Sequence, residues 1–239
     1  MGERRLMRKL IYVPIIHTDA DAGQLAKGLE ERAKKVVGDH NWQRHKEVVR
    51  LYWQEIAGYW EEKEVAGLKV FQDGMPIGGA LGETTVQELA VKGSINHKIV
   101  AHLIEKGAQL MATEDTELLK EEYYLTRDLL EKKSLAGSFS AVSRYKQRKD
   151  ALLRARDHAI VKKINAGLAE GETGVCFLGA YHQVWASLPK DIAVIALKDP
   201  ARVRAYHQQF TSNRAGNDVD RLEAYLTAPI NRETGETNE

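Results

Sequence analysis

Short apolar runs, separated by longer segments with helical periodicity, constrain the fold of this chain more than any other feature. Leu10–Ile16 and Gly174–Leu178 are almost continuously apolar and rich in β-branched or aromatic residues. Leu68–Phe71 and Ile192–Leu197 have a similar character, and Gln109–Ala112 is a fifth candidate. Strands that are apolar on both faces are typical of a parallel sheet covered by helices on both sides. The sequence therefore predicts an α/β fold with a mostly parallel central sheet flanked by helices.

The segments between these runs have the length and apolar spacing of helices. We predict helices at residues 22–37, 45–64, 83–106 (interrupted near Gly93), 115–133 and 140–169. The second of these carries an aromatic and aliphatic stripe that is expected to face the core, formed by Val49, Tyr52, Trp53, Ile56, Tyr59 and Trp60. The glycine-rich stretch 78–82 is expected to form a tight turn.

Residues 8–228 are predicted to form one α/β domain, because a chain of 239 residues can bury a single sizeable core. Within it, residues 115–150 are expected to contain a helical lid, with Ser134–Ser138 as a hinge. Residues 229–239 form a tail that becomes wholly polar from Asn231 and lacks apolar anchors there, so the tail is expected to be disordered.

The composition narrows the class of protein. Lys plus Arg (35) and Asp plus Glu (34) nearly cancel, so no nucleic-acid partner is expected. The single cysteine, Cys176, excludes an intrachain disulfide, and its place inside an apolar run predicts a buried thiol. No apolar run approaches the ~20 residues of a membrane span. We expect a cytoplasmic protein without a membrane partner, and the oligomeric state stays open.

Ionisable side chains follow four of the predicted strands. His17 follows the first, Asp73 the second, Glu114 the run at Gln109–Ala112, and His182 the run that ends at Leu178. Open α/β sheets bind ligands outside the carboxyl ends of their strands. Each residue alone has an ordinary explanation as a helix cap or a loop residue in solvent. Together they favour a functional site at one edge of the sheet.

The predicted helix 140–169 carries an Arg–Asp pair on its apolar face. Asp157 occupies the step of the apolar stripe between Leu153 and Ile160, and Arg156 adjoins it. Buried charges are unfavourable unless they are paired or functional. Two interpretations stay open. The pair belongs to the site, or it forms an internal ion pair that clamps helix to sheet and orients a site residue.

At these residues the chain resembles the TraB, Tiki, EreA and ChaN-like superfamily. The resemblance is carried by the strand before His17, the strand that ends at Asp73, the segment Arg156–Ile164, and the strand followed by Gly-x-x-His at Gly179–His182. It implies a shared α/β fold with differing activities. EreA-like members are esterases acting on a macrolide lactone, Tiki-like members are metal-dependent peptidases, and ChaN-like members bind haem. The resemblance indicates the site better than the reaction.

We predict a hydrolase of an ester or amide bond in a small-molecule or peptide substrate. The candidate catalytic residues are His17, Asp73, Glu114, Arg156, Asp157 and His182. In one version, His17 and His182, together with Asp73 or Glu114, bind a divalent ion such as zinc, manganese or iron, which activates water. In the other, a histidine oriented by a carboxylate acts as a general base without metal. Arg156 is expected to stabilise an oxyanion or hold a substrate carboxylate.

A second hypothesis is a protein that binds haem or a metal ion without turnover. Tyr12, Tyr181 and the aromatic helix 45–64 are then expected to wall a flat apolar ligand, with a histidine or tyrosine as axial ligand. A role in recruiting a protein partner, through the charged faces of 117–133 and 146–149, is a third hypothesis.

Overall fold

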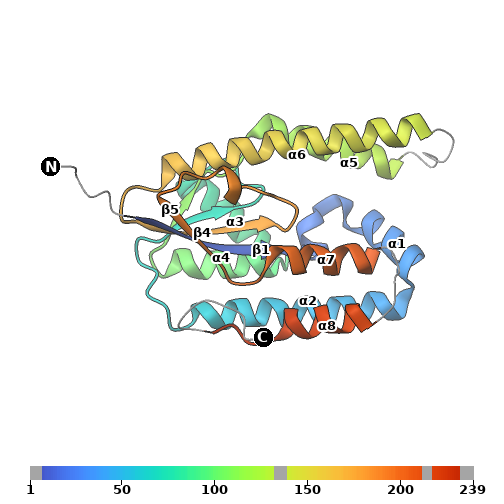
Figure 1. Cartoon of the computed structure of the whole chain (residues 1–239), viewed down its shortest axis with the longest axis horizontal. Helices are drawn as coiled ribbons and strands as arrows, with labels where there is room; N and C mark the ends of the chain where they lie inside the picture. The colour runs from blue at the N-terminus through green and yellow to red at the C-terminus, as the bar shows by residue number, and fades with distance from the viewer. Residues whose placement is uncertain (1–6, 132–138, 212–216, 232–239) are drawn as a thin grey trace.

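A computed structural model of the chain describes residues 7–131, 139–211 and 217–231. Figure 1 shows a central sheet with helices on both of its faces. The predicted hinge at Ser134–Ser138 and residues 232–239 of the predicted tail lie outside the described residues. The predicted lid at 115–150 therefore stays a prediction. The start of the predicted tail is not disordered, because Ile230 is buried in the core.

The described part of the chain contains one five-stranded, all-parallel sheet with strand order β3-β2-β4-β1-β5. Its strands are β1 (Arg8–Ile15), β2 (Lys69–Gln72), β3 (Gln109–Met111), β4 (Thr173–Gly179) and β5 (Ile192–Ala196). Each strand coincides with one of the predicted apolar runs. The predicted α/β fold with a parallel sheet is confirmed.

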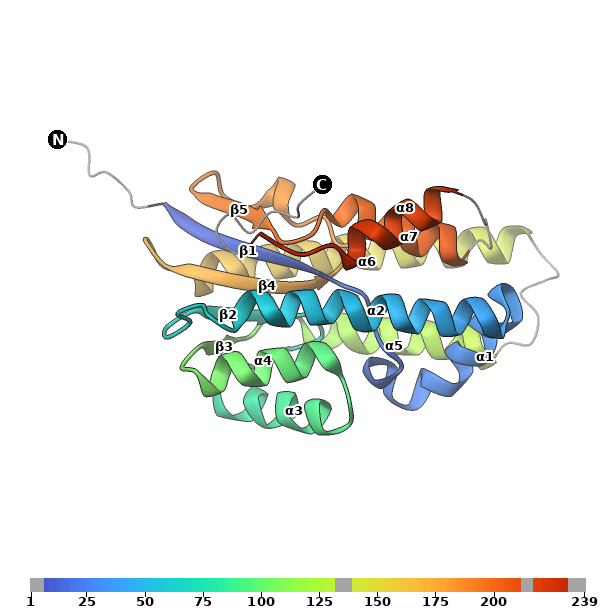
Figure 2. The ribbon, with the colours of Figure 1, turned by 90° about the horizontal axis from the view of Figure 1, so that it is seen from below.

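Helices connect the strands and extend past the sheet at one end, as Figure 2 shows for α2, α5 and α6. The helices are α1 (Ala26–Val37), α2 (Asp39–Trp60), α3 (Gly79–Val91), α4 (Ile95–Glu105), α5 (Thr116–Glu131), α6 (Phe139–Gly167), α7 (Pro200–Thr211) and α8 (Asn217–Thr227). A 3-10 helix at Asp19–Leu25 precedes α1, and a short one lies at Trp185–Ser187. Across the described ranges, none of the helices combines the length and the apolar character that crossing a bilayer requires.

Several helical predictions differ from the structure. The predicted helix 22–37 is α-helical only from Ala26, and α2 begins before residue 45 because Gly38, with a φ of +82°, turns the chain directly from α1 into α2. The stretch 78–82 starts α3 instead of forming a free turn. A Cβ on Gly82 would lie 2.2 Å from the carbonyl oxygen of Ile77, so this close approach requires glycine. The sequence pattern does not predict α7 and α8 at all.

The interruption predicted near Gly93 is confirmed. Gly93 has a φ of +104°, and the next residue, Ser94, is the N-cap of α4, where its hydroxyl accepts a hydrogen bond from the backbone N–H of His97. The predicted helix 83–106 is therefore two helices, α3 and α4.

Two apolar layers hold the helices to the sheet. On one face, Ile160 and Ile164 of α6 pack with Tyr12 of β1 and Leu178 of β4. On the other, α2 packs against β1 and β4, together with residues from α4, α7 and α8. All six residues of the predicted stripe on α2 are buried in this second layer, as expected: Val49, Tyr52, Trp53, Ile56, Tyr59 and Trp60.

The amino edge of the sheet carries a buried arginine at the start of β1. Arg8 donates hydrogen bonds to both carboxylate oxygens of Asp191, at 2.8 and 3.1 Å, and to the side chain and carbonyl oxygen of Asn165. It also donates to the carbonyl oxygen of Leu168 at 2.9 Å. One carboxylate and several neutral oxygens therefore satisfy this guanidinium.

Candidate functional site

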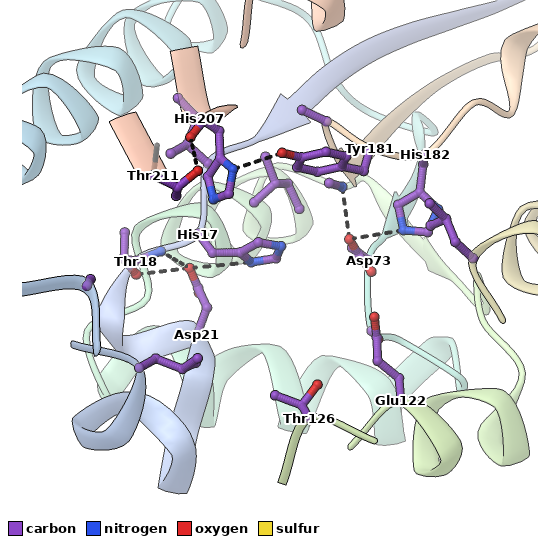
Figure 3. A pocket seen from close by; sticks show the side chains of 18 of the residues that line it. His17, Thr18, Asp21, Asp73, Glu122, Thr126, Tyr181, His182, His207 and Thr211 are labelled. Carbon is purple, nitrogen blue, oxygen red and sulfur yellow. Dashed lines mark hydrogen bonds and ion pairs between the residues drawn. The ribbon is translucent and has the colours of Figure 1, made fainter. Parts of the chain in front are cut away.

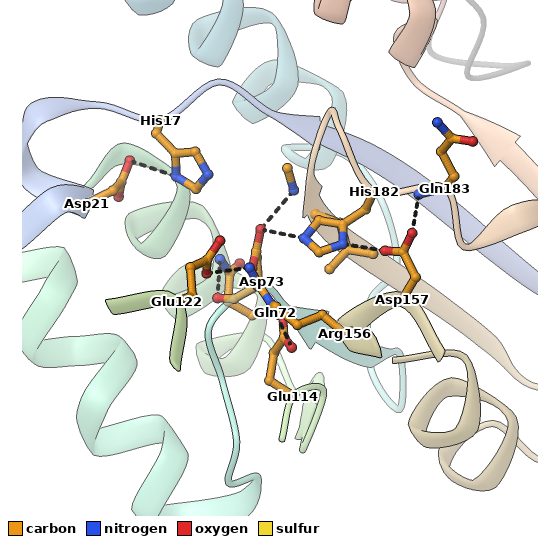
Figure 4. Close-up of polar contacts among 12 residues, drawn as sticks. His17, Asp21, Gln72, Asp73, Glu114, Glu122, Arg156, Asp157, His182 and Gln183 are labelled. Carbon is orange, nitrogen blue, oxygen red and sulfur yellow. Dashed lines mark hydrogen bonds and ion pairs between the residues drawn. The ribbon is translucent and has the colours of Figure 1, made fainter. Parts of the chain in front are cut away.

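Four ionisable residues follow the carboxyl ends of four adjacent strands. Glu114 follows β3, Asp73 follows β2, His182 follows β4 and His17 follows β1, in the order of the strands across the sheet. Ligand atoms of Asp73, Glu114 and His182 all lie within 4.8 Å of one another. Figure 4 shows these side chains with Arg156 and Asp157, which reach them from α6.

Asp73 lies at the centre of the cluster. Its Oδ2 accepts a hydrogen bond from the backbone N–H of Gly179 at 2.9 Å, and its Oδ1 accepts one from Arg156 Nη2 at 2.7 Å. Burial alone raises the pKa of a carboxyl group, but the positive charges of His182 and Arg156 outweigh it and hold the pKa of Asp73 well below its usual range. Asp73 is therefore ionised throughout the physiological range.

Arg156 is surrounded by three carboxylates. Besides Asp73, it donates to both oxygens of Glu114, with Nε at 3.3 Å, and Nη1 donates to Glu122 of α5. Arg156 is only 4% exposed, so the ion pairs are largely removed from water. Most of its donors are committed to protein carboxylates. This geometry matches the interpretation of an ion pair that clamps helix to sheet and leaves the guanidinium little capacity for a substrate oxyanion.

Glu114 has an unusual protonation equilibrium. The side chain is buried, and backbone hydrogen bonds from Thr113 and Glu114 to the carbonyl oxygen of Met75 hold its loop. Burial raises the pKa of Glu114 to about 7, although Arg156 opposes the shift. The negative charge around Arg156 is therefore partly offset by a proton near neutral pH.

His182 is held by the other member of the Arg–Asp pair. Asp157 Oδ1 lies 2.6 Å from His182 Nδ1, and Asp157 Oδ2 accepts a hydrogen bond from the backbone N–H of Gln183 at 3.1 Å. Burial lowers the pKa of His182, but the hydrogen bond to Asp157 and the charge of Asp73 outweigh it and raise this pKa. The remaining ring nitrogen, Nε2, lies 3.7 Å from Asp73 Oδ2.

His17 lies apart from this buried cluster but points toward it. Its side chain is 59% exposed, and Nδ1 is 4.0 Å from Asp21 Oδ2. Figure 3 shows the ring directed from the end of β1 toward Asp73 and His182. A Cβ placed on Gly179 would lie 3.6 Å from His17 Nε2, 3.6 Å from His182 Cδ2 and 3.2 Å from Asp73 Oδ2. Glycine at 179 thus keeps the space between the three side chains clear.

Of these residues, His17, Asp73, Arg156 and His182 line the inner end of a cavity of about 1110 Å³, together with Asp21 and Glu122. Drug-sized ligands occupy pockets of roughly 300–1,000 Å³, so the space is large. Cys176 is fully buried in β4 and burial raises the pKa of its thiol, in keeping with the expected inert role.

Two contributors to the site have little or no signal in the sequence. Glu122 sits in a charged helix face that is indistinguishable in sequence from a solvated one, and only the packing of α5 against α6 brings it to Arg156. The second contributor is a buried network around Asp21. Its carboxylate accepts hydrogen bonds from Thr18 and Ser94, and together with His97 they lower the pKa of Asp21 to about 2 despite burial. The place of Asp21 shortly after His17 indicates that it lies near the site, but nothing in the sequence indicates its partners Ser94 and His97.

Comparisons of the chain with protein-family models, with curated proteins and with solved structures find no match. The resemblance to the TraB, Tiki, EreA and ChaN-like superfamily therefore rests on the short motifs alone.

Proposed function

We propose that this chain is a hydrolase of an ester or amide bond, which it cleaves at the inner end of the cavity with a divalent metal ion bound by His182 and Asp73. The observation that carries the proposal is the line of three side chains Asp157, His182 and Asp73. Asp157 binds Nδ1 of His182 at 2.6 Å, so Nε2 faces Asp73 Oδ2 at 3.7 Å.

The 3.7 Å separation supports a cation between the two atoms. It is too long for a hydrogen bond. Two ligand atoms that each lie about 2.1 Å from one cation are about 3.4 Å apart at a tetrahedral angle, so a small adjustment accommodates an ion such as zinc, manganese or iron. A carboxylate that holds the far nitrogen of a metal-binding histidine is also a recurrent arrangement. Glu114 is the candidate third ligand, because its carboxylate lies within 4.8 Å of both ligand atoms, whereas His17 lies apart and can act as a base.

The local charge supports the same conclusion. Asp73, Glu114 and Glu122 surround one guanidinium, which leaves the pocket short of positive charge. Without a metal, protons on Glu114 and His182 reduce this imbalance, because the pKa values of both groups are raised. A bound cation would compensate the negative charge at pH values where these protons are absent.

The chain's own residues have separate tasks in this mechanism. A divalent ion supplies Lewis acidity, which makes water a nucleophile near neutral pH. Asp157 keeps His182 in the orientation that presents Nε2, and Arg156 holds Asp73 and Glu114 in place. His17 Nε2 accepts a proton from the attacking water and returns it to the leaving group. The water oxygen joins the carbonyl carbon, the C–O or C–N bond breaks, and an acid and an alcohol or amine leave.

The alternative of a haem-binding protein has less support from the cavity walls. Tyr12 is 1% exposed and packs against Trp185, and the aromatic stripe of α2 lies in the core. Of the residues expected to wall a flat ligand, Tyr181 lines the cavity.

The deciding experiment measures metal content by mass spectrometry on untagged protein prepared without chelator. We expect about one equivalent of a divalent transition metal in the wild type, a loss in His182→Ala, and no change in His102→Ala, a matched exposed histidine on α4. With a panel of p-nitrophenyl esters and peptide amides, His182→Ala and Asp73→Asn should reduce kcat/KM by at least about 100-fold.

Two results would contradict the proposal in different ways. Hydrolysis that is unchanged in both His182→Ala and Asp73→Asn would show that the reaction takes place elsewhere. Hydrolysis that is lost in His182→Ala but is indifferent to chelator and metal would replace the metal by a histidine base.

A further inference from the structure

The cavity continues far beyond the ionisable cluster, and stripes on four helices form most of its walls. The stripes repeat at helical spacing, so each helix turns one face to the cavity. They comprise Leu29, Ala33 and Val36 on α1, Leu119, Glu122 and Leu125 on α5, Leu153 and Lys149 on α6, and Val203, His207 and Phe210 on α7. Apart from the inner carboxylates, this lining is mostly apolar.

The length of the cavity can be obtained from α6, because this one continuous helix runs along it and rises by a fixed distance per residue. From Arg156 at the inner end, the face that lines the cavity passes Leu153 and Leu152, then Lys149, then Lys146. Lys149 lies about 10 Å and Lys146 about 15 Å from Arg156 along the helix axis. Figure 1 shows α6 extending in this direction above α1 and α7.

The charges divide the cavity into two ends. The inner end carries the carboxylates of Asp73 and Glu122, whereas the outer part of α6 carries Lys146 and Lys149. Within the described ranges neither lysine forms an ion pair, although Asp150 of the same helix also lines the cavity. On α1, Glu30 is already bound to Lys34 and Trp42. An anionic group is therefore favoured at the outer end and disfavoured at the inner end.

We propose that the substrate is an ester or amide of an elongated, apolar acid that carries a second, anionic group at its far end. The bond to be cleaved lies at Asp73 and His182, the apolar chain lies between α1, α5, α6 and α7, and the anionic end lies at Lys146 and Lys149. The inference rests on the proposed function for the position of the cleaved bond, whereas the apolar and basic walls are independent of it.

The test uses monomethyl esters of linear dicarboxylic acids with about four, eight, twelve and sixteen carbons, whose extended lengths run from shorter to longer than the span of about 10–15 Å along α6. Binding is measured by calorimetry to His182→Ala, which keeps the probe intact, and turnover is measured with the wild type. We expect affinity and kcat/KM to rise about threefold to fourfold for each added methylene until the span is filled. Methyl esters of the monocarboxylic acids of the same length should bind at least about tenfold more weakly.

Matched variants locate the effect. Lys146→Gln with Lys149→Gln should abolish the preference for the second carboxylate, whereas Lys162→Gln with Lys163→Gln, exposed lysines at the other end of α6, should leave it. Ala33→Trp should shift the optimum to shorter chains, and Ala166→Trp, an exposed alanine on α6, should not. The lysine pair keeps the test valid if Ala33→Trp fails to fold.

Affinity that does not depend on chain length, or that is unchanged in the Lys146 and Lys149 double variant, would overturn the inference. If short esters are then still cleaved, the proposed function survives that failure. If long probes bind as expected but no ester is cleaved, the proposed function fails and the assignment of the apolar and basic walls stands.

Discussion

Arg8 and Arg156 lie at opposite edges of one sheet, and both side chains are less than a tenth exposed. Arg8 shares its donors between one carboxylate, Asp191, and neutral oxygens of Asn165 and Leu168. Arg156 forms ion pairs with three carboxylates, those of Asp73, Glu114 and Glu122, at the inner end of a cavity. At the amino edge charge and hydrogen bonds balance within the protein. At the carboxyl edge the carboxylates outnumber the guanidinium that clamps α6 to the sheet, and this excess marks a candidate site.

Removing each guanidinium tests this difference most strongly. Arg156→Met should lower the free energy of unfolding by roughly 4 kcal/mol, because Asp73 and Glu114 stay buried without a cation. Arg8→Met should cost roughly 2 kcal/mol, because Asp191 is 26% exposed and can regain water. Urea unfolding of both variants measures the losses. Adding Glu114→Gln should recover part of the loss in Arg156→Met, and equal losses at the two edges would refute the comparison.

The unusual protonation of Glu114 at the carboxyl edge predicts that the stability of the protein depends on pH. The pKa of Glu114 is about 7 in the folded protein and near 4.5 when exposed, so the folded state holds this proton more tightly. Its contribution is complete below about pH 4.5 and is lost as the pH rises through about 7, in total roughly 3 kcal/mol. Urea unfolding in chelator across this range should show the decline in the wild type and a flatter profile in Glu114→Gln. Glu117→Gln, at an 80% exposed side chain, is the control.

The smallest expected effect on stability comes from the two ends of β4. In Gly174→Ala the added methyl group would meet Lys69, Phe71 and Leu10 at 3.2–3.3 Å, and in Gly179→Ala it would meet Asp73 Oδ2 at 3.2 Å. Each should cost roughly 1 kcal/mol. Only Gly179→Ala should also weaken metal binding, by about tenfold, because its methyl group enters the space between His17, Asp73 and His182. Comparable metal affinity in both variants would show that the metal does not bind in the space between His17, Asp73 and His182.

The strands and the core stripe of α2 could be predicted because apolar periodicity is a local property of the chain. The gathering of Asp73, Glu114 and His182 also followed from sequence, since parallel strands end at one edge. The strand order could not, because an apolar run does not indicate which other run it pairs with. The ion-pair partners of Arg156 could not be predicted from the sequence either. Glu122 lies in an ordinary charged helix, and Arg156 and Asp157, neighbours in sequence, bind different residues.

The central position of β4 has a consequence for how the protein is made. β4 pairs with both β1 and β2, yet it lies at residues 173–179, after three other strands and six helices in the described chain. A nascent chain therefore carries β1 apart from the β2–β3 pair, with apolar edges unpaired, until β4 has left the ribosome. Such late, long-range pairing slows folding and exposes strands to misassociation during synthesis. The segment that completes the sheet is also the one that delivers Gly179 and His182, so sheet closure and assembly of the site coincide in time.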